Sequence, residues 1–318
     1  MYMTTLNEVA EKMIVNDSEI ESFFATIDND EAVKIKAPSH YADSIMDYFT
    51  EDVNGGIPLP FSQAEGRFAI RDGEVTIVSG YSGHGKTAWL SYVVYHMLRE
   101  HKCLIASFEM QPRATLGRMI QQAGNAEPTQ DAIDTFVEGV DENLFIYDAE
   151  GETTAKKVLS VMHYARKKLG VEVFVIDSLM KVGINGDDYN GQKAFINKLC
   201  TFVRDNGSHV FLVAHSRKTL NEYGSPSKFD VMGSSDITNL ADNCLTVFRN
   251  KKKEELINNG EDNAEVSGMK DCFVMVTKQR HGTGWEGSMG LYFNNRTFQY
   301  GEARFASKPI YKRIEFDL

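Results

Sequence analysis

The sequence predicts an α/β fold: a mostly parallel central sheet with helices on both faces, antiparallel additions at its C-terminal edge, and a short helical N-terminal segment. Two observations support this prediction. From about residue 73 onward, short β-branched runs alternate with helical patterns, as they do in βαβ units. In addition, residues 173–176 and 210–213 are almost wholly apolar, which indicates strands buried on both faces at the centre of a parallel sheet.

The individual elements follow from these patterns. Strands are expected at residues 74–79, 103–108, 144–147, 173–177 and 210–214. Helices are expected between them at residues 87–99, 114–123, 155–169 and 192–205. Three later strand-like runs without intervening helices are expected to be the antiparallel additions, at residues 244–249, 272–277 and 288–293. The polar, charged stretch 251–271 is expected to be a mobile surface loop.

The charge of the chain is unevenly distributed. Its formal net charge of -11 taken alone argues against a nucleic-acid partner. However, residues 1–63 hold 12 acidic residues against three lysines, whereas the remainder holds 31 basic and 33 acidic residues. Residues 1–60, with helices expected at 6–13, 18–26 and 41–49 and a turn-rich end, are therefore predicted to be an acidic segment for subunit or partner docking. Residues 61–318 are predicted to form one domain whose basic loops can still hold DNA.

Composition also bears on the cellular compartment. No apolar run is long enough to span a bilayer, and the first 15 residues lack a signal-like pattern, so we expect no membrane association. The cysteines stand singly and suggest neither a zinc site nor a disulfide framework. At 42% hydrophobic residues, the chain can bury one large core without such support. The expected location is the cytoplasm.

One motif carries strong chemical information. Residues 80–87 match G-x-x-x-x-G-K-[ST] and stand between a predicted strand and a predicted helix. Glycines let such a loop curl so that its N–H groups and the helix amino terminus point at phosphates. Lys86 is expected to neutralise phosphate charge and Thr87 to bind Mg²⁺, so the predicted cofactors are ATP or another NTP, and Mg²⁺. A fortuitous Gly-rich turn is the alternative. The predicted nucleotide contacts are Gly80, Ser82, Gly83, His84, Gly85, Lys86 and Thr87.

Two acidic residues end predicted strands. Asp177 follows an apolar run, at the position where an aspartate would hold the magnesium; an Asp that caps the next helix is the alternative. Glu109 follows the strand after the P-loop helix. We expect that strand to neighbour the P-loop strand, so that the Glu109 carboxylate can reach the water attacking the γ-phosphate. A solvated glutamate is the alternative.

Further motifs follow the P-loop in a defined order. They are Ser107-Phe108-Glu109-Met110, Val175-Ile176-Asp177-Ser178-Leu179, Val213-Ala214-His215-Ser216-Arg217-Lys218, Gly233-Ser234-Ser235 leading to Ala241-Asp242-Asn243, and Lys278-Gln279-Arg280. In this order they resemble the DnaB/Twinkle/phage ring-helicase family over residues 58–300. The resemblance implies a RecA-like P-loop NTPase core without a primase domain.

The resemblance also implies catalytic roles. Glu109 would position the hydrolytic water and His215 would sense the γ-phosphate, because a neutral imidazole can donate one hydrogen bond to it. Arg280 would act as an arginine finger in the adjacent subunit's site, with Lys278 beside it, and Lys86 would complete the catalytic set. From position alone, a histidine at a strand end such as His215 is more often structural, and a surface arginine such as Arg280 is usually just solvated.

Single-stranded DNA is implied to contact loops at residues 180–190 and 217–235. The implied contacts are Lys181, Arg217, Lys218, Lys228 and the backbone amides near Gly233 and Ser234. Such groups hold phosphates without reading bases. Met232 stands where many relatives carry arginine. The predicted DNA contacts therefore depend more on Arg217, Lys218 and the backbone. Ordinary solvated lysines are the alternative.

The function implied by the resemblance is an NTP-dependent replicative DNA helicase that forms a ring, translocates on single-stranded DNA in the 5′-to-3′ direction and unwinds duplex DNA. The implied partners are forked or single-stranded DNA, other copies of the chain in a homo-hexamer, and a separate primase and replisome proteins, in a bacterial host's cytoplasm if the chain is phage-encoded. One alternative is a RecA/KaiC-like recombinase or regulatory ATPase without unwinding activity. Another is a loader-like scaffold, against which Lys86, Glu109, Asp177 and Arg280 argue because a scaffold need not keep hydrolytic residues.

Overall fold

The computed structural model describes residues 36–42, 45–46, 55–124, 126–149, 153–216, 230–231, 236–261 and 263–305. The chain divides into two compact units, residues 1–52 and 53–318. The described part of the first unit contains a 3-10 turn, η1 (Pro38–Tyr41). The helices expected at 6–13 and 18–26, and most of that expected at 41–49, lie outside the described residues.

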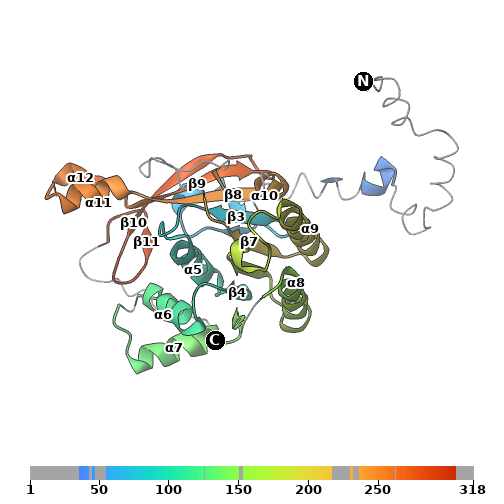
Figure 1. The fold of residues 1–318 in the computed structure, drawn as a ribbon, viewed down its shortest axis with the longest axis horizontal. Coiled ribbons are helices and arrows are strands. Elements are labelled where there is room, and N and C mark those ends of the chain that lie inside the picture. The colour runs from blue at the N-terminus through green and yellow to red at the C-terminus, as the bar shows by residue number, and fades with distance from the viewer. Residues whose placement is uncertain are drawn as a thin grey trace, which may run out of the picture. The chain divides into compact units, whose positions relative to one another are not determined.

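The second unit is built on a nine-stranded sheet with the order β11-β10-β9-β8-β3-β7-β6-β4-β5 (Figure 1). Its strands are β3 (Val75–Ser79), β4 (Cys103–Ser107), β5 (Leu144–Ile146), β6 (Val173–Asp177), β7 (His209–Val213), β8 (Asn243–Arg249), β9 (Cys272–Gln279), β10 (Gly287–Phe293) and β11 (Tyr300–Gly301). A separate antiparallel pair is formed by β1 (Ile57–Pro58) and β2 (Ala69–Ile70). The six strands from β8 to β5 are parallel, and β9, β10 and β11 are antiparallel.

Helices cover both faces of this sheet, and two separate apolar clusters lie beneath them. The helices are α5 (Lys86–Met97), α6 (Pro112–Gln122), α7 (Gln130–Val140), α8 (Ala155–Tyr164), α9 (Tyr189–Asn206), α10 (Asp236–Leu240), α11 (Lys251–Asn258) and α12 (Ala264–Gly268), with the shorter η2 (Ser62–Ala64), η3 (Ala165–Leu169) and η4 (Leu179–Lys181). Alternate residues of one strand serve the two clusters. Val173 and Val175 face α5, α6 and α7, whereas Phe174 and Ile176 face α8 and α9.

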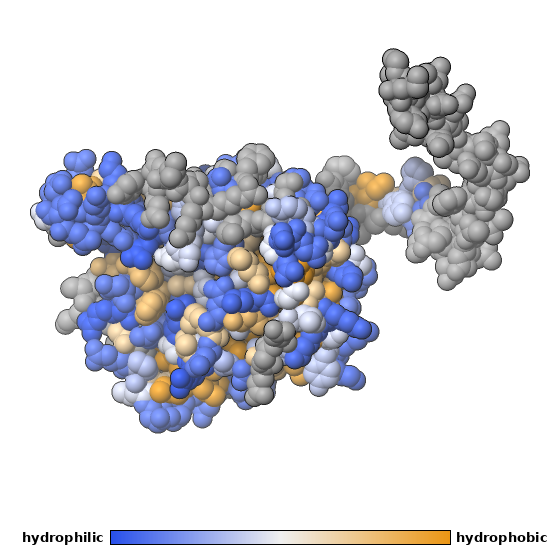
Figure 2. All heavy atoms as spheres, viewed as in Figure 1, coloured by the Kyte–Doolittle hydropathy of each residue, from blue (hydrophilic) through white to orange (hydrophobic). Residues whose placement is uncertain are grey.

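The predicted fold class is confirmed, and two details of it are wrong. The run expected to begin at residue 244 as an antiparallel addition is β8, which pairs parallel with β3 and so belongs to the central sheet. The stretch 251–271, expected to be a loop, contains α11 and α12, which project from one end of this unit (Figure 1). Figure 2 shows a largely hydrophilic surface over these two helices, and this composition is why the sequence suggested a loop.

Local capping explains why this polar stretch is helical. The side chains of Asn250 and Asn263 accept hydrogen bonds from Lys253 N and Val266 N at the starts of α11 and α12. Lys253 is buried, and its Nζ lies 2.6 Å from Asp271 Oδ1. The caps and this partly buried ion pair fix a segment that has few apolar residues. Within the described part of the chain, no helix is both long and apolar enough to cross a membrane.

Candidate nucleotide site

The P-loop joins the end of β3 to the start of α5, as predicted. Gly80 has φ of 148°, and a Cβ there would lie 2.3 Å from Val247 O, so only glycine fits between β3 and β8. Gly85 precedes the first residue of α5 with φ of 86°, in the left-handed region. Ser82 and Gly83 are exposed at the tip of the loop. The loop backbone therefore has the curled form that cradles phosphates.

Lys86 is buried at the base of this loop. Its Nζ donates to Gly80 O at 2.9 Å and Tyr81 O at 3.0 Å, and lies 3.4 Å from His215 Nδ1. Burial lowers the pKa of this ammonium, while the carboxylates of Asp177 and Glu109 act in the opposite direction. The P-loop thus holds the positive charge of Lys86 through two of its own carbonyl groups.

Thr87 and Asp177 meet at the same edge of the sheet. Thr87 Oγ1 donates to Asp177 Oδ2 at 2.6 Å, and Asp177 is buried at the end of β6. Burial raises the pKa of Asp177, although the hydrogen bond from Thr87 partly opposes this. A hydroxyl and a carboxylate side by side beneath a P-loop are the oxygen ligands that Mg²⁺ prefers, so the two residues predicted for the metal fit it.

Glu109 joins His215 and Ser178 in one hydrogen-bonded group. Ser178 Oγ donates to Glu109 Oε1 at 2.8 Å, and His215 Nε2 lies 3.2 Å from the same oxygen. With Nδ1 facing the Lys86 ammonium, the imidazole accepts there and donates from Nε2 to the carboxylate. Burial alone would raise the pKa of Glu109, but the hydrogen bonds from Ser178 and His215 hold it below the ordinary value. The carboxylate is therefore ionised at neutral pH.

The prediction that the strand before Glu109 neighbours the P-loop strand is wrong. The strand before Glu109 is β4, which does not neighbour the P-loop strand, because β7 and β6 lie between β4 and β3. Glu109 reaches the site because β4 pairs with β6, with Ser107 opposite Asp177, and Phe108 N donates to Asp177 O at 2.8 Å. The loop after β4 is thus held against the loop after β6.

His84 lies in the P-loop, but its side chain packs away from the loop's concave side. It is buried, its ring lies 5.1 Å from Tyr81 and 5.5 Å from Phe248, and its Nδ1 accepts from Arg249 N at 3.1 Å. Any phosphate contact from this residue would come from its backbone N–H. Its imidazole instead fixes the P-loop to the end of β8.

Lys278 and Arg280 lie together near the starts of β3 and β8, at the end of these strands opposite to the P-loop. Lys278 Nζ donates to the carbonyls of Thr238, Asn239 and Ala241 at 2.9, 2.9 and 2.6 Å, at the end of α10. Arg280 Nη1 donates to Asp242 Oδ1 at 2.8 Å. Asp242 precedes β8 and bonds to Val75, the first residue of β3, whereas the P-loop follows the last residue of β3. The structure therefore separates these two residues from the P-loop of the same chain.

Lys181, one of the residues predicted to bind DNA, lies in η4. The other five lie outside the described part of the chain: Arg217, Lys218, Lys228, Gly233 and Ser234. Ser216 and Val231, on either side of the segment 217–230, form an isolated antiparallel bridge. β7 ends at Val213, His215 follows two residues later, and the chain returns at Val231 to pair with Ser216.

Sequence reasoning missed several residues that support the site. Gln122 is fully buried, and its Nε2 donates to Ala88 O at 2.8 Å and Phe298 O at 3.1 Å. Tyr300 Oη lies 3.4 Å from Gly85 O. These contacts tie α6 and the C-terminal strands to the P-loop helix, and no local pattern predicts them. Ser178 was detectable, since it follows Asp177 directly.

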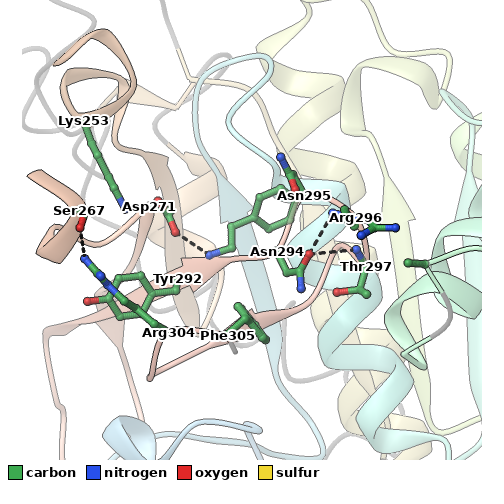
Figure 3. Close-up of a pocket in the computed structure, with 12 residues that line it drawn as sticks. Lys253, Ser267, Asp271, Tyr292, Asn294, Asn295, Arg296, Thr297, Arg304 and Phe305 are labelled. Carbon is green, nitrogen blue, oxygen red and sulfur yellow. Dashed lines mark hydrogen bonds and ion pairs between the residues drawn. The ribbon is translucent and has the colours of Figure 1, made fainter. Parts of the chain in front are cut away.

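A separate cavity of about 350 Å³ lies at the outer edge, between α11, α12 and the end of β10 (Figure 3). Tyr292 lines it, with Lys270 Nζ 4.0 Å from the ring centroid. Asp271 pairs with Lys253 there and accepts from Phe293 N at 2.9 Å. None of the residues predicted for the nucleotide site lines this cavity.

Comparison with known proteins agrees with this geometry. A family model described as an AAA domain matches residues 58–221, more than half of the chain. The chain belongs to this AAA domain family. The match covers the P-loop, Glu109, Asp177 and His215 and stops before Lys278 and Arg280.

Two curated proteins are similar to this chain in sequence, and one of them is named a DNA helicase/primase. The chain is 21% identical over 222 residues to the chloroplastic/mitochondrial Twinkle homolog protein of Arabidopsis thaliana, covering 62% of this chain and 31% of that protein. It is 25% identical over 121 residues to the DNA helicase/primase of Enterobacteria phage T3, covering 35% of this chain and 21% of that protein. The chain thus spans a third or less of either relative.

Two solved structures share the fold. One, described as an ATPase domain, superposes with a TM-score of 0.69 at 15% identity, covering 84% of this chain and 99% of that one. A DnaB-like replicative helicase, solved to describe its interactions with primase, gives a TM-score of 0.67 at 16% identity, covering 92% of this chain and 73% of that one. The resemblance to DnaB/Twinkle/phage ring helicases is confirmed.

Proposed function

We propose that this chain is the motor of a replicative helicase: a ring of identical subunits that hydrolyses an NTP, translocates 5′ to 3′ on single-stranded DNA and unwinds duplex DNA. The observation that carries the proposal is the separation of Arg280 from the P-loop of its own chain by the full length of β3. Five strand residues extend about 17 Å, longer than an arginine side chain. An Arg280 that takes part in hydrolysis must therefore serve the pocket of another subunit.

Within one pocket, each residue has a distinct task. The P-loop amides and Lys86 bind the β- and γ-phosphates, and Thr87 with Asp177 would hold Mg²⁺, which neutralises phosphate charge when bound. Glu109 holds the attacking water, since its carboxylate is ionised and held by Ser178. His215 bonds both Lys86 and Glu109, so a γ-phosphate that draws Lys86 away alters the hydrogen bonds of His215. His215 thereby reports the nucleotide state to residues 217–230.

The DNA partner is supported by the position of this segment. Residues 217–230, with Arg217, Lys218 and Lys228, begin two residues after His215, and Lys181 lies in η4 just after β6. Basic side chains there would meet phosphates from loops that the nucleotide site controls. The Gly233 and Ser234 amides belong to the same proposal. Residues 1–60 are proposed to dock on a neighbouring subunit or on a separate primase, the partner named in the description of one structural relative.

The proposal is tested by mixing two inactive variants. Lys86→Ala should lose hydrolysis because the phosphates lose their cation, and Arg280→Ala because the transferring phosphoryl group loses its finger, an effect of about 10³–10⁵ in rate in known cases. In mixed rings a wild-type pocket can face a wild-type finger. ATPase activity of the mixture should therefore exceed that of either variant alone, on single-stranded DNA.

Two further results would count against the proposal. Robust hydrolysis by Arg280→Ala alone would exclude Arg280 as the arginine finger. Activity in a strictly monomeric preparation would exclude the ring as the active unit. A forked-DNA assay with the wild-type protein separates a helicase from a regulatory ATPase of the same fold. Hydrolysis without strand separation would favour the regulatory ATPase.

A further inference from the structure

Asp242 is the residue through which Arg280 is attached to the fold. Arg280 Nη1 donates to Asp242 Oδ1 at 2.8 Å, and Arg280 Nη2 donates to Asn239 O at 2.9 Å. The Asp242 side chain is 9% exposed, whereas that of Arg280 is 43% exposed. The carboxylate is thus fixed within the protein while the guanidinium reaches solvent.

The other carboxylate oxygen of Asp242 is bound to the P-loop strand. Asp242 Oδ2 accepts from Val75 N at 3.0 Å, and Asp242 N donates to Val75 O at 2.9 Å. Arg280 N in turn donates to Asp242 O at 3.0 Å. Asp242 therefore holds Arg280 through side chain and backbone, and is itself held through both to the start of β3.

The guanidinium keeps donors for a second partner. Arginine carries five N–H groups, and the contacts with Asp242 and Asn239 use one on each terminal nitrogen. The remaining N–H groups make no hydrogen bond within the described part of the chain. His281 also faces the same carboxylate, with Nε2 3.8 Å from Asp242 Oδ1. Arg280 can therefore bind a phosphate oxygen without releasing Asp242.

We propose that Asp242 is the positioning residue for Arg280: its carboxylate orients the guanidinium and couples it to β3, so that the finger offered to the next subunit is held by the strand that carries this subunit's own P-loop. This inference rests on the proposed function, in which Arg280 acts on a neighbouring pocket. Asp242 itself touches no nucleotide. Its effect passes through Arg280, because a displacement of about 1 Å in a catalytic group can cost about 10²-fold in rate.

The first test is the kinetics of Asp242→Asn. An amide has one carbonyl oxygen, so it cannot accept from both Val75 N and Arg280, and its NH₂ faces a second donor. DNA-stimulated kcat should fall about 10²-fold with KM for the nucleotide unchanged, because the finger acts in the transition state. Asp271→Asn is the matched control. Asp271 also pairs with a cation, Lys253, and accepts from one backbone N–H, and its replacement should leave kcat unchanged.

The second test assigns the defect to a finger or to a pocket. Asp242→Asn subunits have intact pockets, so mixing them with Lys86→Ala subunits, which have intact fingers, should restore ATPase activity. Mixing them with Arg280→Ala subunits should not, because every finger in that ring is defective. A merely structural disturbance carried along β3 to the P-loop would give the reverse pattern.

The reverse pattern, recovery in both mixtures or neither, or wild-type kcat in Asp242→Asn alone would each overturn the inference. If the Asn variant does not assemble into rings, Asp242→Glu is scored in the same mixtures, since it keeps the charge but moves it by one methylene. Failure of the proposed function is a separate result, because it appears as near-wild-type hydrolysis by Arg280→Ala alone.

Discussion

At the carboxyl ends of β3, β6 and β7, the polar side chains of the site contact one another across neighbouring loops, whereas at the amino ends of the same strands buried polar side chains hold the backbone near the starts of the strands. We term these the P-loop edge and the amino edge. At the P-loop edge, Lys86, His215 and Glu109 form a series of side-chain contacts. At the amino edge, His209 Nδ1 donates to Arg71 O at 2.7 Å and Asp242 accepts from a backbone N–H.

The difference separates groups that can exchange partners from groups that cannot. A phosphate can replace the contact between Lys86 and His215 without breaking the sheet. By contrast, His209 and Asp242 hold the first residues of the strands in place, and their loss would leave buried polar groups without partners. The P-loop edge is thus the reactive edge of the sheet, and the amino edge is the fixed edge. The proposed ring brings the amino edge of one subunit to the P-loop edge of the next.

The largest expected effect in this comparison is on turnover, and it tests Glu109 at the P-loop edge. Glu109→Gln keeps the shape of the side chain but removes the carboxylate, so nucleotide should bind normally while turnover falls by about 10²–10⁴. Because the pKa of Glu109 is held below its ordinary value, wild-type activity should not lose this carboxylate anywhere in the neutral range. Nucleotide binding and single-turnover hydrolysis measure the two effects separately.

The amino edge provides the matched control for this variant. Glu172 also bonds a histidine, with Oε2 3.1 Å from His101 Nδ1, just before β6 begins. Glu172→Gln should leave turnover unchanged. If Glu109→Gln lost binding and turnover equally, or if both variants lost turnover alike, Glu109 would not be the residue that positions water.

The next effect is on the free energy of unfolding, and it tests His209 at the amino edge. His209 is fully buried and neutral, donating from Nδ1 to Arg71 O and accepting at Nε2 from Thr76 Oγ1 at 3.0 Å. Burial lowers its pKa to about 4. Between the unfolded value of 6.5 and 4, only the unfolded chain binds this proton, so stability is full above pH 6.5 and declines as pH falls through this window, by up to about 3 kcal/mol.

This decline is measured by urea unfolding of the wild type and of His209→Gln at pH 7 and pH 4.5. The wild type should lose more free energy of unfolding than the variant over this interval. Glu74, whose pKa is raised by burial, gives the opposite pH dependence, but it is present in both proteins and cancels in the difference. Parallel pH curves for the two proteins would show that folding does not lower the pKa of His209.

The smallest effect concerns DNA and the P-loop edge. Replacing Arg217 and Lys218 with alanine should reduce the salt dependence of single-stranded DNA binding by about 1.4 in the log-log slope, because two phosphates are no longer neutralised. DNA-stimulated ATPase should fall more than basal ATPase. Lys167 and Lys168, two exposed lysines in η3 at the amino edge, form the control pair. Equal slopes for the two double variants would move the DNA site elsewhere.

The sequence predicted what depends on local pattern. Wholly apolar runs located the central strands to within two residues, and the P-loop motif located Lys86 and Thr87 because phosphate binding there uses consecutive residues. The order of strands could not be predicted from such patterns. The position of β4 beside β6 depends on helix packing over both faces, and the contacts of Lys278, Arg280 and Asp242 join residues distant in sequence from β3 and α10.

The helices α11 and α12 also have a consequence for engineering this protein. Arg249 at the end of β8 pairs directly with Cys272 at the start of β9, so the whole stretch 250–271 is, topologically, one long hairpin loop. The entropic cost of closing a loop grows only slowly with its length, so added residues in this stretch should cost little stability. The stretch is therefore a natural insertion point for a reporter group. A fluorophore placed there would lie one residue from Arg249, whose N–H is bonded to His84 in the P-loop, and would follow that loop from outside the pocket.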